Sequence, residues 1–186
     1  NVSTFTARTI TSSLSDIHGA ITGAIASLKG PLHGGANEEV MHMMNKIKKP
    51  ENALKWINKA LKNRDVVMGF GHRVYKKGDS RVPTMEKYFK KVSKIKNDKK
   101  FIKIYDIVKN VMIERKNIHP NVDYPTGPTY HLMGFDTDFF TPIFVISRIT
   151  GWSAHIMEQH AANKLIRPLS KYSGPEHRKV MPLNYR

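Results

Sequence analysis

The chain has 186 residues, enough for one or two domains with a substantial apolar core. It contains no cysteine, which excludes disulfide bridges, a thiolate nucleophile and sulfur ligands for a metal. No apolar run approaches the roughly 20 residues that a membrane-spanning helix needs, and no signal peptide is recognisable. These features favour a soluble, cytoplasmic protein.

The formal net charge of +16 is concentrated in the middle of the chain. Residues 46–103 hold 19 basic and 5 acidic side chains, a net charge of +14. Such a stretch suits a polyanionic partner, which includes nucleic acid, a membrane surface or a phosphorylated ligand, but it also suits a solvated lysine-rich surface. Lysine outnumbers arginine and no aromatic residues interleave with the basic ones, so nucleic acid is the weaker ligand interpretation.

Hydrophobic periodicity predicts helices along most of the chain, so the expected class is mainly α. Residues 3–27 read as one long buried helix that ends before Pro31 and the Gly34-Gly35 pair. Asn37 is available as the cap of the next helix. The remaining helices are expected over residues 37–48, 50–63, 84–95, 99–116 and 138–163.

Three segments each place an ionisable side chain among residues that form tight turns. They are Gly-Pro-Leu-His-Gly-Gly-Ala-Asn (30–37), Gly-Phe-Gly-His-Arg-Val-Tyr (69–75) and His-Pro-Asn-Val-Asp-Tyr-Pro-Thr-Gly (119–127). The side chains are His33, His72 and Asp123. A carboxylate can remove a weakly acidic C–H proton while imidazoles stabilise the oxygens of the substrate. Together the segments predict carbon-acid chemistry.

Each side chain also has a structural interpretation. A histidine in a loop is more often structural than catalytic, and Asp123 between Pro120 and Pro125 is compatible with an Asx turn. Arg148 interrupts the apolar face of its predicted helix, and a buried arginine needs an anion. Arg167 is a second possible carboxylate clamp. No zinc motif is present, so no metal is expected.

These motifs, in this order and spacing, resemble citrate synthase over essentially the whole chain. The resemblance rests on residues 30–38, 69–81, Pro-Asn-Val-Asp (120–123), Thr-Pro-Ile-Phe-Val-Ile-Ser-Arg-Ile-Thr-Gly-Trp (141–152) and Leu-Ile-Arg-Pro (165–168). The closing Tyr-Ser-Gly-Pro-Glu-His-Arg (172–178) is similar to bacterial members, including 2-methylcitrate synthases.

The resemblance implies an all-α, homodimeric fold in which the active site lies between a large helical domain and a small mobile one. Residues 1–31 and 128–186 would belong to the large domain, and residues 32–127 to the small domain. Family members have a long N-terminal part, with another oxaloacetate-binding histidine just upstream of the position of Asn1. We therefore expect this chain to be the C-terminal half of a longer enzyme.

The resemblance also implies a Claisen condensation of acetyl-CoA with oxaloacetate, giving citrate and CoA. His33 would hydrogen-bond the thioester oxygen, Asp123 would take the proton from the neighbouring carbon, and His72 would polarise and protonate the oxaloacetate carbonyl. Arg81 and Arg148 would hold the oxaloacetate carboxylates, and Arg167 would reach the neighbouring subunit's site. Residues that would line the CoA pocket are Val66, Val67, Gly69, Phe70, Gly71, Lys76 and Asn121.

The acyl-CoA is a substrate in this scheme, and no cofactor, nucleic acid or membrane is expected. The family's counterpart of Lys76 is often arginine. Two alternatives stay within the resemblance: a 2-methylcitrate synthase using propionyl-CoA, which differs by one methylene worth about 1–3 kcal/mol, and a non-catalytic dimerisation fragment. A basic helical nucleic-acid module would explain the lysines but not the ordered motifs.

Overall fold

The computed structural model describes residues 1–75, 78–176 and 179–186, and over these the chain is helical. The α-helices are α1 Val2–Ser12, α2 Ile17–Lys29, α3 Ala36–Ile47, α4 Pro50–Asn63, α5 Val82–Ile95, α6 Lys100–Lys116, α7 Asp123–Met133 and α8 Phe140–Ala161, with 3-10 helices at Thr137–Phe139 and Leu183–Tyr185. Within the described ranges, β pairing is limited to one bridge between Phe70 and Pro120. The expected all-α class is confirmed.

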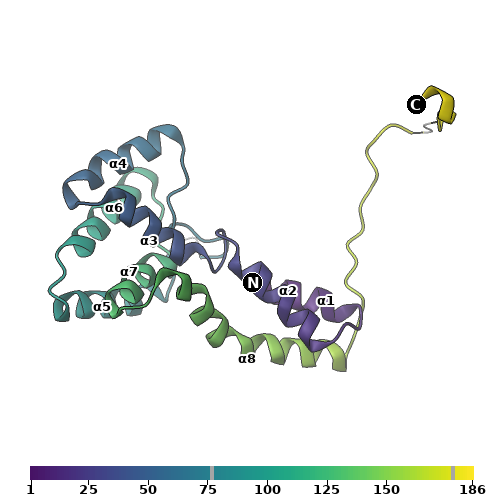
Figure 1. The fold of residues 1–186 in the computed structure, drawn as a ribbon, viewed down its shortest axis with the longest axis horizontal. Helices are drawn as coiled ribbons and strands as arrows, with labels where there is room; N and C mark the ends of the chain where they lie inside the picture. The colour runs from purple at the N-terminus through teal and green to yellow at the C-terminus, as the bar shows by residue number, and fades with distance from the viewer. Residues whose placement is uncertain (76–77, 177–178) are drawn as a thin grey trace.

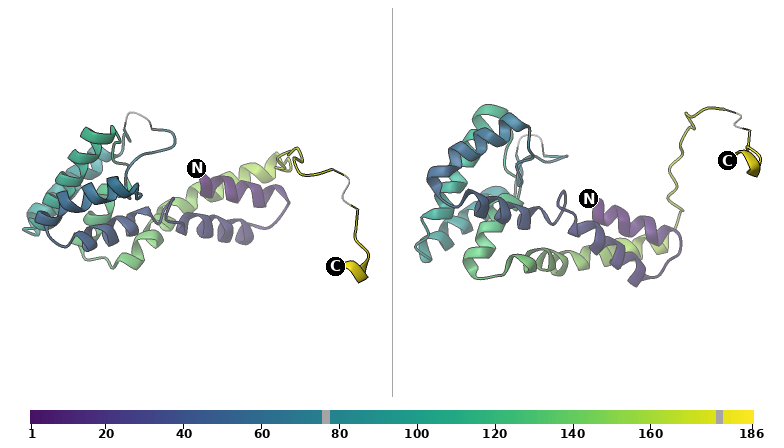
Figure 2. Two further views of the ribbon diagram at one scale, coloured as in Figure 1. Left: turned by 90° about the horizontal axis from the view of Figure 1, so that it is seen from above. Right: turned by 45° about the horizontal axis from the view of Figure 1, so that its top comes forward.

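The helices form two groups with separate apolar cores. Helices α1, α2 and α8 lie side by side (Figures 1 and 2) and bury Leu28, Trp152 and Ile156 between them. Helices α3 to α7 form a bundle at the other end of the molecule (Figure 1). Helix α8 joins the two groups, because its first residue, Phe140, packs in the core of the bundle while Trp152 and Ile156 pack in the other.

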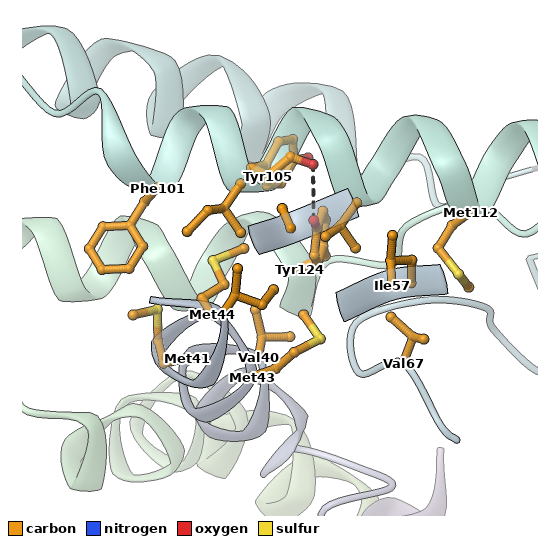
Figure 3. Close-up of a cluster of buried hydrophobic side chains, with 14 of the residues drawn as sticks. Val40, Met41, Met43, Met44, Ile57, Val67, Phe101, Tyr105, Met112 and Tyr124 are labelled. Atoms are coloured by element: carbon orange, nitrogen blue, oxygen red, sulfur yellow. Dashed lines mark hydrogen bonds between the residues drawn. The ribbon is translucent and has the colours of Figure 1, made fainter. Parts of the chain in front are cut away.

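The core of the bundle combines aliphatic and methionine side chains with a stack of tyrosines (Figure 3). Tyr105 of α6 and Tyr124 of α7 are both fully buried, and their rings stack with centroids 4.5 Å apart. The Tyr124 hydroxyl donates a hydrogen bond of 3.0 Å to the Tyr105 carbonyl, which satisfies its buried polar atom. Tyr124 thereby anchors the first turn of α7 in the core.

The expectation of a single helix over residues 3–27 is wrong. The chain leaves α1 after Ser12, Leu14 takes a left-handed φ of 65°, and α2 starts anew at Ile17. The Asp16 side chain caps α2 by accepting a hydrogen bond of 2.8 Å from the Gly19 N–H. The apolar periodicity continues across the break because both helices pack on the same core as α8.

Two other helix starts also differ from expectation. Helix α3 begins at Ala36 after Gly35, so Asn37 lies buried within the first turn and does not cap it. Helix α7 begins at Asp123, where a turn was expected across residues 119–127. Pro125 is tolerated there because the first four N–H groups of a helix have no intrahelical partner. Asp123 is therefore held by a helix start and not by a rigid turn.

The helices expected over residues 50–63, 84–95 and 99–116 are present within two residues of their predicted bounds. No helix in the described part of the chain is long and apolar enough to cross a membrane.

Truncating Ile57 to alanine should destabilise the bundle, because its side chain on α4 is fully buried in the core. We expect the free energy of unfolding to fall by about 2–5 kcal/mol, measured by chemical denaturation. Leu54→Ala on the same helix is the matched control, since Leu54 is 50 % exposed and should cost less than about 1 kcal/mol. Equal losses for the two variants would contradict this packing.

Candidate active site

A pocket with a volume of about 850 Å³ lies where the two helix groups meet. It is lined by residues of α1, the turn between α2 and α3, the segment after α4, the start of α7 and the face of α8. Most of the predicted site residues line it, namely His33, His72, Asp123, Arg81, Arg148, Val66, Val67, Gly69, Phe70, Gly71 and Asn121. Residues from five separate segments thus share one cavity.

His33 lies in the turn that joins α2 to α3. The turn is tight at Gly35, where an added Cβ would come within 2.5 Å of the Lys29 carbonyl oxygen. The Ser3 N–H on α1 points at His33 Nε2 at 3.3 Å, and the Ser3 hydroxyl lies 2.9 Å from the same nitrogen. Because a backbone N–H can only donate, Nε2 is the acceptor and the ring proton lies on Nδ1. Trp152 Nε1–H donates to the Ser3 hydroxyl at 3.3 Å.

The His33 ring is held as a neutral donor. Burial, and after it the positive charge of Arg148, lower the pKa of His33 below the ordinary value for a histidine. A neutral imidazole with its proton on Nδ1 can donate a hydrogen bond to an oxygen in the pocket. Ser3, which determines this tautomer, was not identified from the sequence because an isolated serine in a helix carries no local signal of its role.

His72 and Asp123 are brought together by an antiparallel contact between residues 69–71 and 119–121. The Gly71 N–H donates to the His119 carbonyl and the Asn121 N–H to the Gly69 carbonyl, both at 2.9 Å. The Asn121 side chain adds two links, donating from Nδ2 to the Gly71 carbonyl at 2.9 Å and accepting from the Asp123 N–H at 3.0 Å. Asn121 therefore couples the residue before His72 to the first residue of α7.

Gly69 is required by this contact. Its φ of +83° lies in the left-handed region, and an added Cβ would come within 2.8 Å of both Tyr124 Cβ and Val40 Cγ2. The close approach lets Phe70 pack against Tyr124, with ring centroids 4.4 Å apart.

The His72 ring is oriented by its own loop. Its Nδ1 accepts hydrogen bonds from the Val74 N–H at 3.0 Å and the Tyr75 N–H at 3.2 Å, and the ring lies 4.5 Å from that of Tyr75. Since Nδ1 accepts, Nε2 carries the proton and is the nitrogen left to donate. The residue is exposed at the pocket wall.

Asp123 has the properties of a base that works near neutral pH. Its Oδ1 is buried and has no hydrogen-bond partner among the described residues. Burial raises the pKa of Asp123 to about 7; the Asp79 charge adds to this effect, whereas Arg81 opposes it. A carboxyl group that exchanges its proton near pH 7 is suited to general acid–base catalysis.

Three arginines, Arg73, Arg81 and Arg148, line the pocket and give it positive charge. The Arg81 guanidinium pairs with Asp79, with Nε 2.9 Å from Oδ1 and Nη2 2.7 Å from Oδ2. Burial alone would raise the pKa of the Asp79 carboxyl, but hydrogen bonds from Arg81 hold this pKa below its usual range. Arg148, half-buried on α8, makes no hydrogen bond or ion pair within the part of the chain that the structure describes. It remains available for an anion.

One predicted residue, Arg167, does not line the pocket. Arg167 is exposed in the segment after α8, which leaves the body of the molecule (Figure 1). The beginning of this segment is tied down, since the Ile166 N–H donates to the Ser12 hydroxyl at 3.0 Å. Lys76 lies outside the described residues. Across the described ranges, no group of three or more His, Asp or Glu side chains is arranged to hold a metal.

Comparison with protein families gives one match over most of the chain. The model for the citrate synthase C-terminal domain matches residues 1–169. The match includes every predicted site residue.

Several curated proteins match the entire chain or nearly so. 2-Methylcitrate synthase 2 of Corynebacterium glutamicum is 59 % identical over 186 residues, 100 % of this chain and 49 % of that protein. 2-Methylcitrate synthase of Mycobacterium tuberculosis is 56 % identical over 98 % of this chain and 46 % of its own length. Citrate synthase 2 of Bacillus subtilis is 45 % identical over 100 % of this chain and 50 % of its own length. The chain thus spans about half the length of these relatives.

Solved structures show the same fold. Citrate synthase of Thermoplasma acidophilum, in a ternary complex with carboxymethyl coenzyme A and oxaloacetate, superposes with a TM-score of 0.91 at 38 % identity, covering 100 % of this chain and 51 % of that one. Citrate synthase of Thermotoga maritima superposes with a TM-score of 0.88 at 38 % identity, covering 100 % of this chain and 52 % of that one.

Asp123→Asn should stabilise the folded protein at neutral pH. The carboxyl ionises near pH 4 in an unfolded chain, whereas its pKa in the fold is about 7. Ionisation therefore destabilises the fold progressively between these values and fully above pH 7. We expect the variant to be more stable by about 4 kcal/mol at pH 8, with the gain lost at pH 4, in urea titrations. The exposed Asp136→Asn is the control; a pH-independent gain at Asp123 would contradict the burial argument.

Proposed function

Since the chain belongs to the citrate synthase family, we propose that it forms the C-terminal half of an enzyme that condenses acetyl-CoA with oxaloacetate. The acyl group becomes an alkyl group on transfer, and the products are citrate and CoA. The observation that supports this most strongly is the gathering of His33, His72 and Asp123, with two arginines, around one pocket. A base, two oxygen-directed donors and carboxylate clamps are what this condensation needs.

The chemistry divides among the three side chains. Asp123 takes a proton from the carbon beside the thioester while His33 Nδ1–H donates to the thioester oxygen, so that the developing enolate is stabilised. The new carbon–carbon bond forms as this carbon attacks the oxaloacetate carbonyl, and His72 protonates the carbonyl oxygen. Water then cleaves the thioester, releasing citrate and CoA. The neutral state of His33 suits its role because an uncharged donor does not lower the pKa of the Asp123 base, as an imidazolium nearby would.

Oxaloacetate is held by Arg81 and Arg148 through its carboxylates in this scheme. Arg167 is exposed and does not line the pocket of its own chain, which suits a role in the site of a second copy. We therefore propose a homodimer in which Arg167 completes the partner's pocket.

Residues 32–127 form the small domain in our proposal, and residues 1–31 with 128–186 contribute to the large one. The separate cores of the α3–α7 bundle and of α1, α2 and α8 support this division. The CoA moiety lies along residues 66–71 with Asn121 and Lys76, and all of these except Asn121 belong to the basic stretch of residues 46–103. The acyl-CoA is a substrate, and these steps use no additional cofactor.

Propionyl-CoA is the alternative acyl donor, which would make the product 2-methylcitrate. Relatives named 2-methylcitrate synthase at 59 % and 56 % identity favour it. One methylene in a pocket changes the specificity by about 10–200-fold. Side-by-side values of kcat/KM for acetyl-CoA and propionyl-CoA in the intact enzyme decide between the two donors.

His33→Ala should lower kcat by about 10²–10⁴-fold, because the enolate loses its hydrogen-bond donor. Release of CoA with oxaloacetate as the acceptor measures the rate. His42→Ala is the control, since His42 lies exposed on α3 and contacts Glu39. Full condensation activity in the His33 variant would exclude the assigned role.

The basic stretch should favour capture of the CoA phosphates through long-range attraction. Raising ionic strength screens such attraction, so the KM for acyl-CoA should increase several-fold between about 0.01 and 0.15 M salt. The KM for a short acyl thioester without the nucleotide is the matched control and should change less. A salt-independent KM for acyl-CoA excludes this electrostatic contribution.

A further inference from the structure

We propose that Asp79 is a positioning residue that fixes, with one buried carboxylate, both the substrate-binding edge of Arg81 and the start of helix α7 at Asp123. This inference rests on the proposed function, and it concerns a residue that contacts neither substrate. Asp79 lies in the segment between the His72 loop and α5.

Both oxygens of the Asp79 carboxylate accept hydrogen bonds, and the donors are Arg81 and Val122, which lie far apart in the sequence. Its side chain is 0 % exposed, compared with 45 % for that of Arg81. Oδ1 accepts from the Arg81 backbone N–H at 3.0 Å and from Nε at 2.9 Å. Oδ2 accepts from Arg81 Nη2 at 2.7 Å and from the Val122 N–H at 3.1 Å. These four bonds join the start of α5 to the residue just before Asp123.

The pairing determines which edge of Arg81 can meet a substrate. A guanidinium has two forked edges, and Asp79 occupies the one formed by Nε and Nη2. The edge formed by Nη1 and Nη2 is left to bind a second carboxylate in the pocket that Arg81 lines. The side chain is further confined by the Tyr75 ring, whose centroid lies 5.8 Å from Cζ. Asp79 thus presents Arg81 in a fixed orientation.

The same carboxylate acts on Asp123 through position and charge. Val122 is tied to Asp79, and the Asp123 N–H is tied to Asn121, so both residues at the start of α7 are held from outside the helix. The Asp79 charge offsets that of Arg81 at Asp123. Other titratable or charged groups around Asp123 are Tyr130 on α7 and, lining the same pocket, His33, His72, Arg73, Tyr75 and Arg148.

Asp79→Asn in the intact enzyme tests the proposal, because the amide keeps the shape but removes the charge and one acceptor. We expect kcat/KM for oxaloacetate to fall by at least about tenfold through misplacement of Arg81. The acid limb of the pH profile of kcat/KM for acyl-CoA should also shift to lower pH, because the Asp79 charge, which disfavours ionisation of Asp123, is removed.

Asp98→Asn is the matched control. Asp98 also accepts backbone hydrogen bonds at a helix start, from Phe101 at 3.1 Å, but it lies away from the pocket. This variant should keep the wild-type kcat/KM and acid limb. An Asp79→Asn profile like that of Asp98→Asn, or a fall in kcat/KM without a shift of the acid limb, overturns the proposal.

Amide hydrogen exchange covers the case in which Asp79→Asn does not fold, and it does not depend on the reaction. In the unsubstituted protein, the Val122 N–H should exchange at least about 100-fold more slowly than an unprotected amide, because Asp79 accepts its bond. Exchange at the unprotected rate overturns the proposal. Failure of the proposed function would instead appear as absence of condensation by the unsubstituted enzyme.

Discussion

The antiparallel contact between residues 69–71 and 119–121 is the interaction on which the pocket depends. Three hydrogen bonds of 2.9 Å hold it, and one of them comes from the Asn121 side chain, which also accepts from the Asp123 N–H. Behind it, Phe70 and Tyr124 pack at 4.4 Å, so the contact is backed by the core of the bundle. The contact therefore sets how the His72 loop lies against the start of α7.

The opposite wall of the pocket comes from the other helix group. Ser3 of α1 and Trp152 of α8 form a hydrogen-bonded series that ends on His33, so packing of α1 against α8 sets the tautomer of a ring in the turn before α3. Arg148 projects from the same helix as Trp152. The relative placement of the two groups therefore determines how His33 faces Asp123 across the pocket.

The sequence, with its family resemblance, predicted the all-α class and eleven of the residues that line the pocket, but not the contacts that hold them. Strong local periodicity located the helices over 50–63 and 99–116 to within two residues. The sequence does not reveal the break at Leu14, because α1 and α2 pack on the same core with α8 and the apolar pattern therefore continues on both sides of the break. The start of α7 was missed because its prolines read as turn residues, and Ser3 and Asp79 were missed because their partners lie far along the chain or in backbone atoms.

A structure of the intact protein with oxaloacetate and an unreactive acyl-CoA analogue tests the central claim most directly. The five segments that meet at the pocket are predicted to form a single condensing site. The analogue's acyl group should lie within hydrogen-bond distance of both His33 Nδ1 and the Asp123 carboxylate, with the oxaloacetate carboxylates on Arg81 and Arg148. An acyl group or oxaloacetate bound away from these side chains would contradict it.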